Sequence, residues 1–128
     1  MKKIERKFMD LIFKVDKEKT KDEVLEEINT QLSLINDIKL ADKIKLYFVE
    51  PTLHFAIWDY SATKDKYPVW LIISSGDTGI LFSEYGYGFG NWGLITLSSQ
   101  PLYFGPDFCW YPTLKDAFLD SWMAEQKT

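Results

Sequence analysis

The chain has few of the residues on which many protein functions depend. It contains one cysteine, Cys109, and one histidine, His54, so it forms no internal disulfide and cannot assemble a Cys/His zinc cluster. Arg6 is its single arginine, which leaves little capacity for the bidentate contacts that recognise phosphate or guanine. No apolar run is long enough to span a bilayer, and charged residues interrupt the apolar positions that a secretion signal would need. We therefore expect a cytoplasmic protein with no membrane segment, no metal and no cofactor.

Positive charge is missing from a long central stretch. Residues 67–114 contain no Lys, Arg or His, although Asp77, Glu84 and Asp107 lie there. Residues 1–50 hold eleven basic and eleven acidic residues, whereas the remainder holds four basic and eight acidic, which accounts for the net charge of −4. Affinity for nucleic acid comes largely from Lys and Arg that neutralise phosphates. The sequence therefore argues against nucleic-acid binding.

The hydrophobic pattern begins with two helices in a single domain of 128 residues. A helical period runs through the first apolar positions: Ile4, Phe8, Leu11, Ile12 and Val15. A second helix starts at Thr20, which forms an S/T-x-x-E capping box with Glu23. Its expected buried face continues through Leu25, Ile28, Leu32 and Ile35. Two amphipathic helices joined by a short polar loop predict an αα-hairpin.

From Lys43 onward the apolar period changes to two, which is typical of strands. The expected strands cover residues 43–49, 54–60, 69–73, 80–82, 94–97 and, as a short last strand, 108–111. Pro51 should end the first of them, and residues 74–79 should form a hairpin turn. Thr113 then caps a final helix with one apolar face: Leu114, Ala117, Phe118 and Trp122. The predicted fold class is α+β, with an N-terminal αα-hairpin, an antiparallel meander of about five strands and a C-terminal helix.

Motifs that resemble catalytic signatures lack the context that catalysis requires. Gly88, Gly90 and Gly93 match G-x-G-x-x-G, but the strand-like residues 94–97 follow where a dinucleotide-binding fold needs a helix. The D-T-G sequence at 77–79 resembles the aspartic-protease signature, but the match covers three residues only and an ordinary hairpin turn accounts for it better. His54 and Cys109 alternate with apolar and aromatic residues, which favours packing over a nucleophile–base pair. We therefore expect no catalytic residues and no enzyme activity.

The strongest irregularity is the glycine-rich segment 85–93. If the segment is extended, one side carries only glycines and the other carries the rings of Tyr85, Tyr87 and Phe89. Trp92 follows them in the sequence. One interpretation is a long hairpin whose rings fold over the edge of the core. The other is a partner surface, because Tyr and Trp are enriched at interface hot spots. Residues 102–108 form a further aromatic loop with glycine and proline.

The junction of the last strand and the final helix, W-Y-P-T-L-K-D-A-F at residues 110–118, resembles the small bacterial immunity proteins of polymorphic and contact-dependent toxin systems. The order of the expected elements is also similar. The resemblance implies a cognate toxin as partner, with no cofactor and no turnover.

These observations favour a protein-binding module over an enzyme. The specific prediction is an acidic immunity or inhibitor protein that neutralises a basic partner, such as a toxin nuclease, because acidic surfaces accelerate association with basic active sites. An alternative is a small-ligand or carbohydrate-binding domain that uses the same rings as a stacking wall. Nothing in the sequence specifies an oligomeric state. The predicted partner-binding residues are Asp77, Glu84, Tyr85, Tyr87, Phe89, Trp92 and Asp107.

Overall fold

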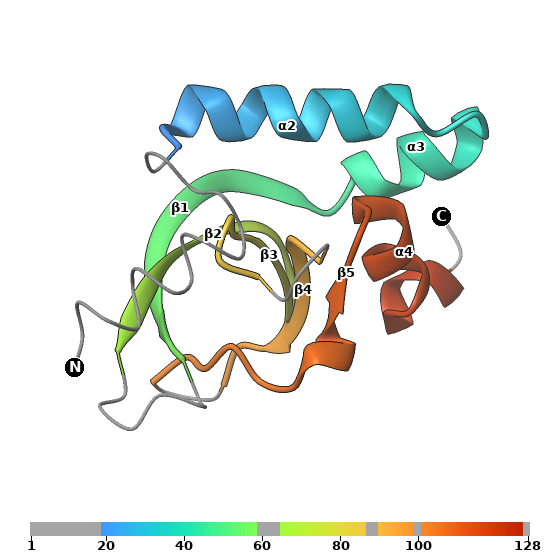
Figure 1. Ribbon diagram of the computed structural model, residues 1–128. Helices are drawn as coiled ribbons and strands as arrows, with labels where there is room; N and C mark the ends of the chain where they lie inside the picture. The colour runs from blue at the N-terminus through green and yellow to red at the C-terminus, as the bar shows by residue number, and fades with distance from the viewer. Residues whose placement is uncertain (1–18, 59–64, 87–89, 99–100, 127–128) are drawn as a thin grey trace.

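The structure, a computed structural model, describes residues 19–58, 65–86, 90–98 and 101–126. Two helices precede a five-stranded antiparallel sheet, and a short helix follows it (Figure 1). The elements are α2 (Lys21–Ser33), α3 (Ile38–Lys45), β1 (Phe48–Ile57), β2 (Lys66–Ser75), β3 (Thr78–Phe82), β4 (Trp92–Thr96), the 3-10 turn η1 (Asp107–Cys109), β5 (Trp110–Tyr111), α4 (Leu114–Leu119) and the 3-10 turn η2 (Trp122–Glu125). This architecture confirms the predicted α+β class, the antiparallel meander and the C-terminal helix.

The sheet is a meander whose strands pair in chain order from β1 to β5. It is strongly curved, and β1 bends around until its end lies beside the segment that precedes η1 and β5 (Figure 1). There the Ile57 amide donates to the Leu102 carbonyl at 2.9 Å, and the Phe104 amide donates to the Ile57 carbonyl at 2.9 Å. These bonds form a parallel bridge between Ile57 and Tyr103, which closes the curved sheet on itself at one corner.

The core has two parts, one on each face of the sheet. The cluster enclosed by the curved sheet consists of Ala56, Tyr67, Val69, Leu81, Tyr85, Leu102, Phe104 and Trp110. The cluster between sheet and helices includes Val24, Ile28, Ile44, Ile72, Ile80, Phe82, Trp92, Leu114 and Phe118. In β2, Val69 belongs to the first cluster and Ile72 to the second, and both are fully buried. β2 is therefore covered on both faces, as its continuous apolar run predicts.

Local signals in the sequence place several element boundaries correctly. The Glu23 amide donates to Thr20 Oγ1 at 3.3 Å and the Thr20 amide to Glu23 Oε1 at 2.9 Å, which confirms the capping box of α2. Thr113 begins α4 by accepting from the Asp116 amide at 3.1 Å. The turn between β2 and β3 is the predicted hairpin, in which Gly76 takes a φ of +58° that favours glycine.

The segment between α2 and β2 differs from the prediction. The strand predicted over residues 43–49 is wrong, because α3 extends through Lys45 and β1 begins only at Phe48. Helix α3 buries Ala41 and Ile44, which are spaced as on a helix face. Pro51 does not end a strand but lies inside β1, and the separate strand expected to start at residue 54 is the continuation of β1, which ends at Ile57. β1 tolerates a proline because it is an outer strand whose register with β2 is irregular at that point.

Two helix faces also differ from the prediction. Leu25 is exposed, and Val24 takes the buried position in its place. Helix α4 ends at Leu119, so Trp122 does not continue its face and is half-exposed in η2. The helix predicted over residues 4–15 lies outside the described residues. Of the helices that the structure describes, none is both long and apolar enough to cross a bilayer.

Candidate functional site

The rings of the glycine-rich segment belong to the core where the structure describes them. Tyr85 is 1% exposed, and its ring centroid lies 5.0 Å from that of Tyr67. Trp92 is 2% exposed and lies 4.8 Å from the ring of Phe82. The prediction that Tyr85 and Trp92 contact a partner is therefore wrong, because neither ring presents surface to one. The other two rings of that prediction lie outside the described residues: Tyr87 and Phe89.

The glycines of this segment make room for one buried side chain, that of Trp110. A Cβ atom on Gly93 would lie 2.8 Å from Cζ2 of the Trp110 ring, and one on Gly90 would lie 2.9 Å from the Trp110 carbonyl. A Cβ atom on Gly86 would lie 2.8 Å from the same ring and within 2.0 Å of the Gly90 carbonyl oxygen. The Trp110 indole is 5% exposed and donates from Nε1 to the Phe104 carbonyl at 2.7 Å. Close packing thus accounts for these three glycines.

The three predicted carboxylates do not share one surface. Asp77 lies in the turn before β3, and Glu84 lies beyond the other end of that strand, roughly 20 Å away for an extended chain. Asp77 is adjacent to the end of β4, because its carbonyl accepts from the Leu97 amide at 2.7 Å and its Oδ2 accepts from the Ser98 hydroxyl at 2.8 Å. Asp107 is exposed at the start of η1. Glu84 therefore lies apart from Asp77 and does not belong to the same surface.

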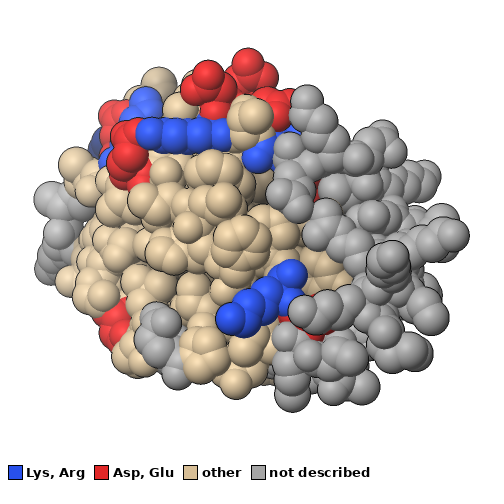
Figure 2. Space-filling model, turned by 90° about the vertical axis from the view of Figure 1, so that its left-hand side faces the viewer, with Lys and Arg blue, Asp and Glu red and all other residues tan. Residues whose placement is uncertain are grey.

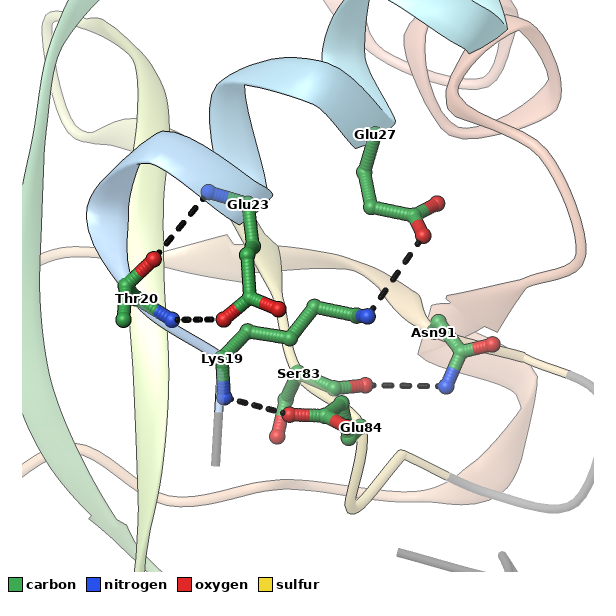
Figure 3. Close-up of polar contacts among 7 residues, drawn as sticks. All are labelled: Lys19, Thr20, Glu23, Glu27, Ser83, Glu84 and Asn91. Carbon is green, nitrogen blue, oxygen red and sulfur yellow. Dashed lines mark hydrogen bonds and ion pairs between the residues drawn. The ribbon is translucent and has the colours of Figure 1, made fainter. Parts of the chain in front are cut away.

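Glu84 joins the sheet to the start of α2 (Figure 3). Its Oε1 accepts from the Lys19 amide at 2.9 Å, and Lys19 Nζ lies 3.7 Å from Glu27 Oε1. Asn91 Nδ2 donates to the Ser83 carbonyl at 2.9 Å on the other side of the same hollow, which holds about 230 Å³. Because each of these polar groups is bonded to another part of the chain, we interpret the cluster as a structural tie between α2 and the β3–β4 connection.

A second hollow runs beside β4 and is called the β4 groove here. It holds about 240 Å³ and is lined by Leu94, Ile95, Thr96, Tyr103, Phe104, Gly105, Pro106 and Cys109. Phe108 is 75% exposed and Tyr103 is 39% exposed. Asp107 and Phe108 lie in the chain between the lining residues Pro106 and Cys109. Tyr103 therefore lines the groove, and the exposed Asp107 and Phe108 lie next to it in the chain without lining it. Exposed rings beside a carboxylate, the combination predicted for the glycine-rich segment, occur here instead.

Tyr103 and Phe108 were not among the predicted partner-binding residues. The signal that points to them is the aromatic loop with glycine and proline at residues 102–108. This signal does not identify the exposed rings, because the loop also contains Phe104, which is fully buried. Local spacing does not separate these rings, since Phe104 lies beside the bridge between Ile57 and Tyr103, whereas Phe108 lies in the 3-10 turn η1.

Another apolar surface lies on β1 (Figure 2). Leu53 is 46% exposed and Phe55 is 54% exposed on this strand. Figure 2 shows that charged side chains gather over α2 on this side of the molecule and that few interrupt the described surface below it. The carboxylate of β1, Glu50, pairs with Lys21 of α2, so this surface does not carry the excess of acidic side chains found near the β4 groove.

The β4 groove does not carry a catalytic set. Its thiol, Cys109, has no histidine among the lining residues, and the chain's one histidine, His54, is on β1 with Nε2 3.0 Å from Thr52 Oγ1. Burial, and secondly the negative charge of Asp107, raise the pKa of the Cys109 thiol, whereas nucleophilic cysteines have lowered values. Among the residues that the structure describes, no group of three or more His, Cys, Asp and Glu side chains could hold a metal ion.

Alkylation of Cys109 by iodoacetamide is expected to be slower than that of an unperturbed cysteine near neutral pH. The raised pKa lowers the fraction of thiolate, so the rate should rise only at a more alkaline pH. Asp107→Asn removes the second cause and should shift the pH–rate profile to lower pH, whereas Asp116→Asn on α4 should leave it unchanged. Mass spectrometry of the modified peptide over a pH series measures both. An identical profile in Asp107→Asn and the parent would show that the carboxylate does not act on the thiol.

No known family model, curated protein or solved structure matches this chain. The functional argument therefore depends on the residues of the chain itself.

Proposed function

We propose that this chain is a protein-binding module that neutralises a basic partner, as an immunity or inhibitor protein neutralises a toxin nuclease. The observation that carries the proposal is the composition of the surface around the β4 groove. Phe108, the most exposed of the aromatic rings on described residues, follows directly after the exposed Asp107. Asp77 lies beside the end of β4, one of the strands that line the groove.

Charge supports a basic partner over a neutral or acidic one. Residues 67–114 supply β3, β4, β5, η1 and most of β2, and they contain no Lys, Arg or His to offset their carboxylates. A surface of one sign raises the rate at which an oppositely charged protein associates and disfavours partners of the same sign. Exposed aromatic rings supply the desolvated contacts that dominate binding energy in protein interfaces. The surface therefore carries both components that such a docking site needs.

The small-ligand alternative has less support. Its proposed stacking wall depended on rings that include Tyr85 and Trp92, which are buried. The β4 groove, at about 240 Å³, is smaller than the roughly 300–1,000 Å³ of typical ligand pockets. A protein partner does not require an enclosed cavity, so it fits the observed shape better.

Co-purification at low salt with matched baits tests the proposal. The parent chain should retain a basic protein in stoichiometric amount, and salt should release it because the attraction is electrostatic. The double variant Asp77→Asn/Asp107→Asn should lose that protein. The control Glu26→Gln/Asp42→Asn makes the same change in net charge at exposed positions on α2 and α3 and should retain it.

Neutralisation is then measured on the purified partner. Its catalytic activity should fall when the parent chain is added in equimolar amount and should persist with the Asp77→Asn/Asp107→Asn variant. Retention of the same protein by all three baits, or of none by the parent, would contradict the proposed function.

A further inference from the structure

Part of β4 has no strand paired to it on one side among the residues that the structure describes. β5 pairs with β4 at two positions, Trp92 with Tyr111 and Gly93 with Trp110. On its other side β4 pairs with β3 along its whole length, as far as Thr96 opposite Thr78. Within the described part of the chain, residues 94–96 therefore have a strand neighbour on one side only.

Backbone polar groups must point outward at this edge. In an antiparallel sheet, successive residues direct their N–H and C=O groups alternately to the two neighbouring strands. Among Leu94, Ile95 and Thr96, at least one residue therefore directs both groups away from β3 and toward the β4 groove. The chain does not continue β5 there, because Cys109, which precedes Trp110, belongs to the 3-10 turn η1.

The free edge of β1 and the unpaired stretch of β4 differ in how they are protected. Natural sheets protect exposed edges with proline, lysine or irregular register, all of which hinder pairing with another chain. β1 contains Pro51 and an irregular register with β2. Residues 94–96 contain no proline and no charge, and the β3–β4 register is regular throughout. The edge that borders the groove is thus the one suited to accept a further strand.

We propose that the edge of β4 at residues 94–96 receives an extended, lysine- or arginine-containing segment of the basic partner as an added strand. This inference rests on the proposed function and specifies how the partner is held. Backbone hydrogen bonds to the edge supply affinity in this mode, and side-chain contacts in the groove supply specificity. The choice of a basic segment follows from charge complementarity with Asp107 and Asp77, since no cation occurs within residues 67–114.

A defined peptide tests the inference without knowledge of the natural partner. The probe is a terminally blocked hexapeptide of alternating lysine and valine, titrated at low salt into the isotopically labelled full chain. Amide chemical-shift changes should concentrate at Leu94, Ile95 and Thr96. A twin peptide with every amide nitrogen methylated has the same side chains and charge but no N–H groups, and it should bind at least about tenfold more weakly. A second twin with glutamate in place of lysine should also lose binding.

Matched variants of the chain locate the effect. Thr96→Lys places a cation at the edge and should weaken binding of the lysine peptide at least about threefold relative to Thr30→Lys, which adds the same charge on α2. Chemical shifts of the two variants without peptide serve as the control that both remain folded.

The outcomes separate this inference from the proposed function. Equal binding of the methylated twin, shifts confined to other strands, or no binding of the parent peptide would each overturn the added strand. The bait experiment is independent of these results, because it depends on the carboxylates and not on strand pairing. A basic protein lost from the Asp77→Asn/Asp107→Asn bait would then still support the docking surface.

Discussion

Replacing Trp110 with alanine is expected to lower the free energy of unfolding by about 3–5 kcal/mol, the largest loss of stability predicted for this chain. The indole is buried, stacks on the ring of Phe104 at 5.3 Å and donates a hydrogen bond to the carbonyl of the same residue. Gly86 and Gly93 pack against the indole ring, and Gly90 packs against the backbone of Trp110. Alanine would leave a cavity that this rigid surround cannot fill. Circular dichroism during denaturant unfolding measures the loss.

A double-mutant cycle tests whether the glycines serve the indole. Gly93→Ala alone should cost about 1–3 kcal/mol, because its Cβ would lie 2.8 Å from the benzene half of the Trp110 ring. Trp110→Phe removes that half of the ring and should abolish most of the cost of Gly93→Ala, a coupling that additive substitutions do not show. Gly76→Ala is the comparison, because no atom lies within 4 Å of its Cβ position and only its positive φ opposes the change.

Additive costs in that cycle would contradict the packing explanation of the glycine-rich segment. The explanation requires that the penalty of a methyl group at position 93 depend on the size of the side chain at position 110. The cost of Gly76→Ala should be the same in both backgrounds, because its turn lies at the far end of β3 from this cluster. A cost of Gly93→Ala that persists with Trp110→Phe would point to backbone conformation instead.

The elements predicted correctly are those whose signals are local. The capping box of Thr20 and Glu23 requires only four adjacent residues, and the hairpin at Gly76 requires only the turn itself. The continuous apolar run of β2 is typical of a strand covered on both faces. Each of these signals remains the same whatever the rest of the chain does.

The errors occur where one pattern fits two structures. Around Ile44, apolar residues alternate with lysines as in a strand, yet Ala41 and Ile44 are also three residues apart as on a helix face. The start of α3 at Asp37, whose side chain accepts from the amides of Lys39 and Leu40, decides for the helix. Pro51 is accommodated in β1, an edge strand with an irregular register at that point, and strand order is not a local property.

The candidate site also separates what local sequence predicts from what depends on distant parts of the chain. The sequence defines a glycine-rich aromatic segment, but Tyr85 and Trp92 are buried by rings far away in the chain or across the sheet, such as Tyr67. Phe108 is exposed because the chain leaves the sheet at η1 before β5. The absence of Lys, Arg and His from residues 67–114 is visible in the sequence, whereas the exposure of Tyr103 and Phe108 is not. Aromatic composition alone does not tell buried rings from exposed ones.

Replacing Phe108 with alanine is expected to weaken binding of the basic partner by about 2 kcal/mol or more, roughly a thirtyfold loss of affinity. The ring is 75% exposed beside Asp107, so its removal should change the free energy of unfolding by no more than about 0.5 kcal/mol. Calorimetric titration of the co-purified partner measures affinity, and denaturant unfolding measures stability.

Phe55→Ala provides the matched control, because it removes the same kind of ring, 54% exposed on β1, from a position that does not line the β4 groove. Its effect on partner affinity should stay within about twofold, since an exposed ring outside the interface contributes little to binding. If Phe55→Ala weakened the partner as much as Phe108→Ala, the interface would lie on β1 or span both surfaces, and the β4 groove would lose its assignment. If Phe108→Ala had no effect while Asp107→Asn did, the surface would act through charge alone, and the exposed ring would need a different explanation.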